Sequence, residues 1–226
     1  MTETTPGYAI ALAAAEHERH EAYVHELAAE LIETAETAVN APVVIGLDPS
    51  LTGTGIASSN GWCDVIGYKK ARTKDPGITQ LPHAQRLHAL RTLATQVLEA
   101  IARPDLVVME LPAVSRSGGG AHERGWFWWQ LYGQLHNRQI PIGLLAPNAR
   151  ALYATGKGNA AKGAVIDQVS RRFPAWTTDG NDNAADAVAL MAAGRDWLGH
   201  PITELPKTHR AAIDKAIWPT LPGDHS

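Results

Sequence analysis

The run Val43–Leu47 is short and almost wholly apolar, and an acid, Asp48, follows it directly. A run of this kind, without polar alternation, is typical of a central strand covered on both faces, so the sheet needs helices on either side. Gly53–Ser59 and Trp62–Tyr68 predict two further strands, because Asn60-Gly61 between them favours a two-residue hairpin turn. We therefore expect three antiparallel strands at the start of the fold.

The rest of the chain alternates helices and strands. Apolar residues recur at helical spacing over 82–102, and Asp105–Leu111 returns to a buried strand, so this helix is expected to cross over to a parallel strand. A helix over 123–137 and a strand over 140–146 follow. Helices are then expected to start near Asn148, Asn159 and Asp182, each of which offers an N-cap side chain. The pattern indicates the α/β class.

Length and composition limit the remaining possibilities. The chain has 226 residues, 45% of them apolar, which suits one main domain. No apolar run approaches the roughly 18 residues that a spanning helix needs, and the acidic N-terminus disfavours a secretory signal. Cys63 is the single cysteine, which fits a reducing cytoplasm. We expect an acidic helical arm at 1–40 (its helix over 8–38), a main domain at 41–199 and a tail with a short helix at 200–226.

The net charge of −3 conceals an uneven distribution. Residues 1–40 hold eight Glu against Arg19, a net of −7, which leaves +4 for residues 41–226. Within that part, residues 111–175 carry eight basic residues against Glu123 and Asp167, a net of +6. This segment could face phosphate, although a solvated surface with chance clustering would look the same.

Acidic residues stand where a buried charge would need partners. Asp48 ends one apolar strand and Glu110 ends another, and the parallel pairing of those strands would bring the two carboxylates together. Asp182 and Asp186, four residues apart, share one face of an alanine-rich helix. Converging carboxylates repel unless a hard divalent cation compensates, and oxygen-only ligation favours Mg²⁺ or Mn²⁺. For Asp48 the alternative is a turn-forming Asp-Pro at a strand end.

Four motifs give the chain a family resemblance: Ile45–Ser50, Val108–Glu110, Ala154–Lys162 and Asp182–Ala187. In their order and spacing they resemble the RuvC-type Holliday-junction resolvases of the RNase H-like superfamily, especially the forms found in phages and prophages. The likeness covers residues 42–198. It implies an RNase H-like α/β fold with a mixed five-stranded sheet flanked by helices, to which this chain adds an N-terminal helix.

The resemblance also implies roles for single residues. Asp48, Glu110 and Asp186 would be catalytic metal ligands; the fourth would be Asp182, which we favour, or Asn183. Lys162 would lie near the scissile phosphate. The family's second basic position falls on Ala151 here, so Arg150 would substitute for it, and the position of an aromatic wedge falls on Ala113. The expected DNA-binding residues are Arg116, Arg124, Arg150, Lys157, Gly156 and Gly158.

The implied activity is endonucleolytic cleavage of branched DNA, above all four-way junctions, by two Mg²⁺ or Mn²⁺ ions per active site. Because a four-way junction is two-fold symmetric, the resemblance implies a homodimer. One alternative is an ATPase or small-molecule kinase of the actin and sugar-kinase class, since Asp48–Gly55 is similar to its phosphate loop except at Ser50. The other is a structure-specific DNA-binding protein without catalysis, for which Asn183 is the hint.

An aromatic cluster, Trp126–Trp129 with Tyr132, holds five of the chain's 14 aromatic residues. At helical spacing one packed face cannot bury all five side chains. We expect core packing together with a dimer contact, and base stacking at an opened junction is the alternative.

Overall fold

The computed structural model describes residues 19–29, 41–112 and 120–221. The chain divides into two units, Met1–Ala41 and Pro42–Ser226. In the first unit residues 19–29 are helical, and the rest of the helix expected over 8–38 lies outside the described residues. Among the described residues, no helix is both long and apolar enough to cross a lipid bilayer.

The second unit is built on one five-stranded sheet with the order β3-β2-β1-β4-β5. Its strands are β1 (Val44–Asp48), β2 (Thr54–Ser58), β3 (Trp62–Ile66), β4 (Leu106–Glu110) and β5 (Ile142–Leu145). β1, β2 and β3 pair antiparallel, whereas β4 and β5 continue from β1 in parallel. The expected mixed five-stranded sheet is confirmed.

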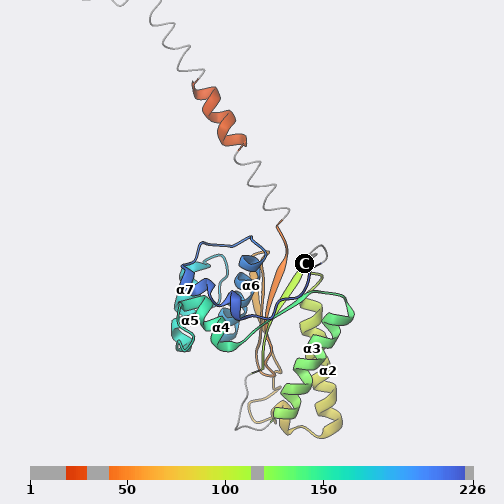
Figure 1. Cartoon of the computed structure of the whole chain (residues 1–226). Coiled ribbons are helices and arrows are strands. Elements are labelled where there is room, and N and C mark those ends of the chain that lie inside the picture. The colour runs from red at the N-terminus through yellow and green to blue at the C-terminus, as the bar shows by residue number, and fades with distance from the viewer. Residues whose placement is uncertain (1–18, 30–40, 113–119, 222–226) are drawn as a thin grey trace, which may run out of the picture. The chain divides into compact units, whose positions relative to one another are not determined.

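Helices cover both faces of the sheet, as the apolar β1 requires (Figure 1). One face carries α2 (His83–Ala100) and α3 (Ala121–Asn137). The other carries α4 (Pro147–Thr155), α5 (Lys162–Arg172) and α6 (Asp182–Trp197). Alternate strand residues pack into two apolar cores, one on each face of the sheet. Ile45, Leu47 and Met109 pack with α2 and α3, whereas Val44 and Val108 pack on the α6 side. The sheet is therefore buried from both sides at β1 and β4.

The C-terminal segment packs onto the α4 and α6 layer. It contains α7 (Lys207–Arg210) and the 3-10 turn Ile213–Lys215. The buried His209 ring lies 2.8 Å from the Tyr153 carbonyl oxygen, measured from Nδ1, and Trp218 stacks on Trp197 at 4.6 Å between ring centroids. The His209 contact holds the end of α4, and the Trp218 stack holds the end of α6.

All three expected N-cap residues are wrong, although a helix begins near each of them. α4 begins at Pro147 after Ala146, and α5 begins at Lys162 after Ala161, so neither Asn148 nor Asn159 caps a helix. A proline at the first position of α4 is compatible with a helix start because its missing N–H would have no intrahelical partner there. Among the helices of the described residues, α6 alone begins with a side-chain cap, and that cap is Asn181 rather than Asp182: Asn181 Oδ1 accepts from the amides of Asn183 and Ala184.

Glycines allow α6 to lie almost against the backbone of β1 and β2. A Cβ at Gly46 would overlap the carbonyl oxygen of Ala187, and one at Gly55 would overlap that of Asn183. The obstacles are helix backbone atoms, which cannot move away as a flexible side chain could. This approach brings the first turns of α6, with Asp182 and Asp186, next to the end of β1.

We expect Gly46→Ala to lower the free energy of unfolding by about 2–3 kcal/mol, because the added methyl must push α6 off the sheet. Gly125→Ala is the matched control: Gly125 lies within α3, and a Cβ there meets no atom within 4 Å. That substitution should stabilise by about 0.5–1 kcal/mol, since alanine loses less backbone entropy in a helix. Urea unfolding of the two variants gives the comparison; equal stabilities would contradict the close approach of α6.

Candidate active site

Asp48 and Glu110 end two parallel strands that are hydrogen-bonded to each other. Leu47 of β1 is in register with Met109 of β4, so the next residues along each strand emerge side by side at the same sheet edge. Both strands are buried up to their last residue, where Asp48 and Glu110 are partly accessible. The chain therefore places two carboxylates at the edge of an otherwise apolar core.

α6 adds two further carboxylates from across the sheet. Asp182 is the first residue of the helix and Asp186 stands one turn later, on the side that packs against β1. Asp186 is buried, whereas the Asp182 side chain is 31% exposed. The structure thus brings together all four carboxylates that the sequence singled out, with Asp182 at the rim.

Arg150 of α4 lies between two of these acids. Its Nε is 2.5 Å from Glu110 Oε2, and its Nη1 contacts Asp186 Oδ1. The three side chains are only 10–13% exposed. Arg150 was predicted to bind DNA, but in this arrangement its guanidinium bridges Glu110 and Asp186. A buried ion pair of this kind compensates charges that would otherwise be costly to bury.

The site holds more negative charge than Arg150 can balance. Burial raises the pKa of Glu110 to about 7, and the neighbouring Asp48 adds to that rise, while Arg150 opposes it. Burial also raises the pKa of Asp48; Arg150 opposes this shift and Asp182 adds to it. A raised pKa means that the charged form of the carboxyl group is disfavoured in its surroundings. A further cation at this edge of the sheet would stabilise the charged forms of Asp48 and Glu110.

The donor set fits a hard divalent cation. All four acids offer only oxygen, the ligand atom that Mg²⁺ and Mn²⁺ prefer. Glu110 Oε2 is buried, and its close contact within the described residues is the ion pair with Arg150 Nε. Within the described residues no three acidic, His or Cys side chains converge on one point. The Arg150 guanidinium lies between Glu110 and Asp186, so these two carboxylates could share an ion only once it moves.

Lys162 and Asp182 form an ion pair at the rim. Lys162 opens α5, its side chain is 79% exposed, and its Nζ contacts Asp182 Oδ2. The hydrogen bond from Lys162 lowers the pKa of Asp182, so this carboxylate stays charged. The neighbouring Asn183 side chain packs toward Gly53, in the loop after Asp48. Both candidates for the fourth ligand therefore adjoin the site, from different directions.

The residues expected to contact DNA have different surroundings, and one of them lies outside the described residues. Gly156 ends α4 in the left-handed conformation, with φ of 77°, and the His209 ring covers it on the side where a Cβ would point. The helix end therefore requires glycine at position 156 for structural reasons, independently of any contact with DNA. Lys157 is exposed and Gly158 lies near the Asn148 carbonyl. Arg124 is on the first turn of α3, whereas Arg116 and Ala113 lie outside the described residues.

Trp128 is a site contact that the sequence analysis missed. Its indole Nε1 donates a 2.8 Å hydrogen bond to the backbone carbonyl of Glu110. Phe127 and Trp128 are buried, so the expectation of core packing holds for them, but Trp129 is 65% exposed. Trp128 also stacks on Tyr132, at 5.4 Å between ring centroids. The dense aromatic residues of α3 were the signal in the sequence. Only the contact between α3 and β4 in the structure shows that Trp128 binds the Glu110 carbonyl.

Comparisons with known proteins agree with this arrangement. The crossover junction endodeoxyribonuclease RuvC of Frankia alni is 30% identical over 190 residues, covering 81% of this chain and 92% of the relative. The enzyme of the same name from Ruegeria pomeroyi is 29% identical over 151 residues, covering 65% and 87%. No protein-family model matches the sequence.

A solved structure shares the fold. The structure of T. thermophilus RuvC in complex with Holliday junction substrate superposes with a TM-score of 0.50 and 22% identity, covering 70% of this chain and 97% of that one. The mixed five-stranded sheet with helices on both faces is an RNase H-like fold. Given its likeness to the Frankia relative, the chain belongs to the RuvC family of crossover junction endodeoxyribonucleases.

The raised pKa of Glu110 predicts a pH-dependent stability. Between pH 4.5 and about 7 folded Glu110 keeps a proton that the unfolded carboxyl has lost, so the metal-free protein loses stability as pH rises through this range. In EDTA, Glu110→Gln should therefore gain on the order of 2–3 kcal/mol over wild type between pH 5 and about 8. Denaturant unfolding at several pH values measures this gain.

The control for this series is Glu99→Gln, which neutralises an exposed carboxylate on α2. Its stability should follow the wild-type pH curve. Parallel curves for wild type and Glu110→Gln would show that Glu110 titrates normally, against the burial described here.

Proposed function

We propose that this protein is a metal-dependent endonuclease that cuts branched DNA, above all four-way junctions. The observation that carries the proposal is the group of Asp48, Glu110 and Asp186 at one edge of the sheet, in a chain of the RuvC family. Buried carboxylates with raised pKa values mark sites where a cation and chemistry are expected. Four oxygen-bearing acids at such a point suit phosphodiester hydrolysis better than acid and base catalysis alone.

Asp48, Glu110, Asp182 and Asp186 would hold the metal, Mg²⁺ or Mn²⁺, with two ions per site. When bound, the ions would activate a water for in-line attack and stabilise the leaving 3′ oxygen, so that a 5′-phosphate and a 3′-hydroxyl result. Lys162, exposed at the rim, would offset negative charge on the non-bridging phosphate oxygens. Trp128 would hold the end of β4, and hence Glu110, in place.

Arg150 would act in two settings. Without a cation its guanidinium compensates Glu110 and Asp186. Once those carboxylates neutralise an ion instead, the guanidinium becomes available to pair with phosphate, for which its planar fork of donors is suited. Arg150 would thus keep its predicted DNA-binding role and would also act as a counter-ion to Glu110 and Asp186. Lys157, Arg116 and Arg124 would extend the positive surface toward the DNA backbone.

A homodimer follows from the substrate rather than from this chain's own contacts. A four-way junction has two strands to cut in symmetry-related positions, so paired nicks need two sites related by a two-fold axis. Of the alternatives, an actin or sugar-kinase-like ATPase would close two domains over its nucleotide, whereas residues 42–226 form one unit. A DNA-binding protein without catalysis differs from the proposed enzyme only in cleavage, which the following experiment measures.

We expect the purified protein to nick a synthetic four-way junction in Mg²⁺ and not in EDTA. Asp48→Asn, Glu110→Gln and Asp186→Asn should each reduce the cleavage rate at least 1000-fold while junction binding survives, because each removes ligand charge from a preformed site. Glu99→Gln on α2 is the matched control and should cut at the wild-type rate. Wild-type cleavage in EDTA, or by Asp186→Asn in Mg²⁺, would refute the metal assignment.

The fourth ligand can be identified separately. Asp182 supplies charge and adjoins Lys162, whereas the Asn183 side chain packs toward Gly53. We therefore expect Asp182→Asn to cost at least tenfold more cleavage activity than Asn183→Ala, with a larger loss at low Mg²⁺. Initial rates across a Mg²⁺ series give the comparison, and the opposite ranking would assign the fourth ligand to Asn183.

A further inference from the structure

A second basic feature lies outside the segment 111–175 that the sequence analysis emphasised. The loop that follows β3, residues 67–77, carries Lys69, Lys70, Arg72 and Lys74 within six positions, and all four are exposed. Within the described residues none of them forms an ion pair with a carboxylate. The one acid in the loop, Asp75, accepts a 2.7 Å hydrogen bond from the Arg72 backbone amide. We call residues 69–74 the basic loop.

The base of this loop is fastened beside Asp48. β3 ends at Ile66 in register with Thr54, so the chain leaves the sheet at the edge where Asp48 and Gly55 pair. The Tyr68 amide then donates a 3.0 Å hydrogen bond to the Leu51 carbonyl. Gly67 lies so close to the Thr52 backbone that a Cβ would overlap it. The loop and the turn after Asp48 thus form one backbone assembly.

The other end of the loop reaches the start of α3. Ile78 is buried, and the Thr79 side chain packs so closely on Gly120, the residue before α3, that a Cβ there would lie 2.6 Å from it. The Arg86 side chain pairs with Glu123 and with the Leu81 carbonyl, which joins α2 to α3 at the same place. The segments on either side of the basic loop, at Gly67–Tyr68 and at Ile78–Thr79, are therefore both held in place. The loop borders the sheet edge that carries Asp48 and Glu110.

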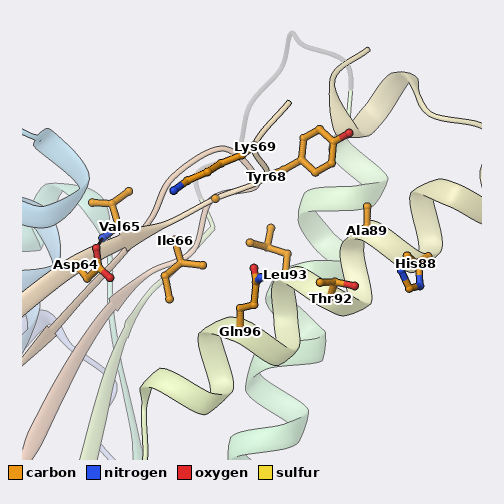
Figure 2. Close-up of a pocket in the computed structure, with 11 residues that line it drawn as sticks. Asp64, Val65, Ile66, Tyr68, Lys69, His88, Ala89, Thr92, Leu93 and Gln96 are labelled. Atoms are coloured by element: carbon orange, nitrogen blue, oxygen red, sulfur yellow. Dashed lines mark hydrogen bonds between the residues drawn. The ribbon is translucent and has the colours of Figure 1, made fainter. Parts of the chain in front are cut away.

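At the start of the loop, Tyr68 is half-buried against the apolar core and Lys69 is exposed. Figure 2 shows Tyr68 and Lys69 extending in opposite directions from the chain, at the mouth of a hollow between β3 and α2. The hollow has a volume of about 630 Å³, and Asp64, His88 and Gln96 line it with Lys69. Its lining is of mixed polarity and charge, so it does not by itself define a ligand. The cations beyond it are free to meet an extended anion.

We propose that the basic loop binds the phosphate backbone of a duplex arm of the DNA next to the cleavage site. This inference rests on the proposed function and adds a contact surface to it. Four cations held together without carboxylate partners repel one another, and a polyanion relieves that repulsion. Three of the four are lysines, whose compact charge suits sequence-independent contact with phosphate. The anchored ends keep this charge at a fixed place relative to Asp48.

The test compares two double variants of equal charge in the full-length protein. Lys70→Ser/Arg72→Ser removes two cations of the basic loop. Arg91→Ser/Arg103→Ser removes two exposed arginines, one on α2 and one just before β4, at the end of that strand opposite Glu110. Affinity for a fluorescent four-way junction and for its linear duplex arm is measured in EDTA across a salt series, and thermal unfolding checks that both variants fold.

For the loop variant we expect the slope of log affinity against log salt to fall by about two and the affinity at low salt to fall at least tenfold, because each phosphate contact contributes about 0.9 to the slope. The control should match wild type. Equal slopes for the two variants would overturn the inference. If the wild type cuts the junction but the slopes are equal, only the loop assignment fails. If only the loop variant loses duplex affinity but no junction is cut, the endonuclease proposal fails and the loop assignment stands.

Discussion

The ion pairs of Arg150 with Glu110 and Asp186 are the interaction on which the site depends. They join α4 to β4 and to α6, three elements from distant parts of the chain, at a point that is largely withdrawn from water. Without a cation there, the carboxylates would repel one another and burial would favour their protonated forms. The same need for positive charge supports the proposal that this edge binds divalent ions and DNA.

Close packing makes that charge concentration possible. Gly46 and Gly55 let α6 lie on the backbone of β1 and β2, which brings Asp186 to the end of the sheet. On the opposite face, Trp128 of α3 fastens the last residue of β4 through its carbonyl. Helices on both faces of the sheet therefore help to position Asp186 and Glu110. The fold tolerates the cost of burying these acids because its large apolar core contributes more stability than their burial removes.

Much of the fold follows from local pattern. The apolar runs before Asp48 and Glu110 mark strands buried on both faces, and parallel pairing of such strands places the two acids together without further information. The Asn60-Gly61 turn similarly determines the β2 and β3 hairpin. By contrast, the bridging position of Arg150 depends on how α4 packs between β4 and α6, a long-range arrangement that no local pattern encodes. Asn148 within α4, Asn159 before α5 and Asp182 at the first position of α6 misled the N-cap assignment, because capping depends on backbone conformation as well as residue type.

The proposed activity requires that a metal ion replace Arg150 as the partner of Glu110 and Asp186. A crystal structure of the protein soaked in Mn²⁺, with anomalous scattering collected to locate the ion, tests this directly. The predicted result is an anomalous peak within ligand distance of Asp48, Glu110 and Asp186, with the Arg150 guanidinium moved away from both acids. An Arg150 still bound to Glu110 and Asp186, with no peak beside Asp48 at saturating Mn²⁺, would contradict it.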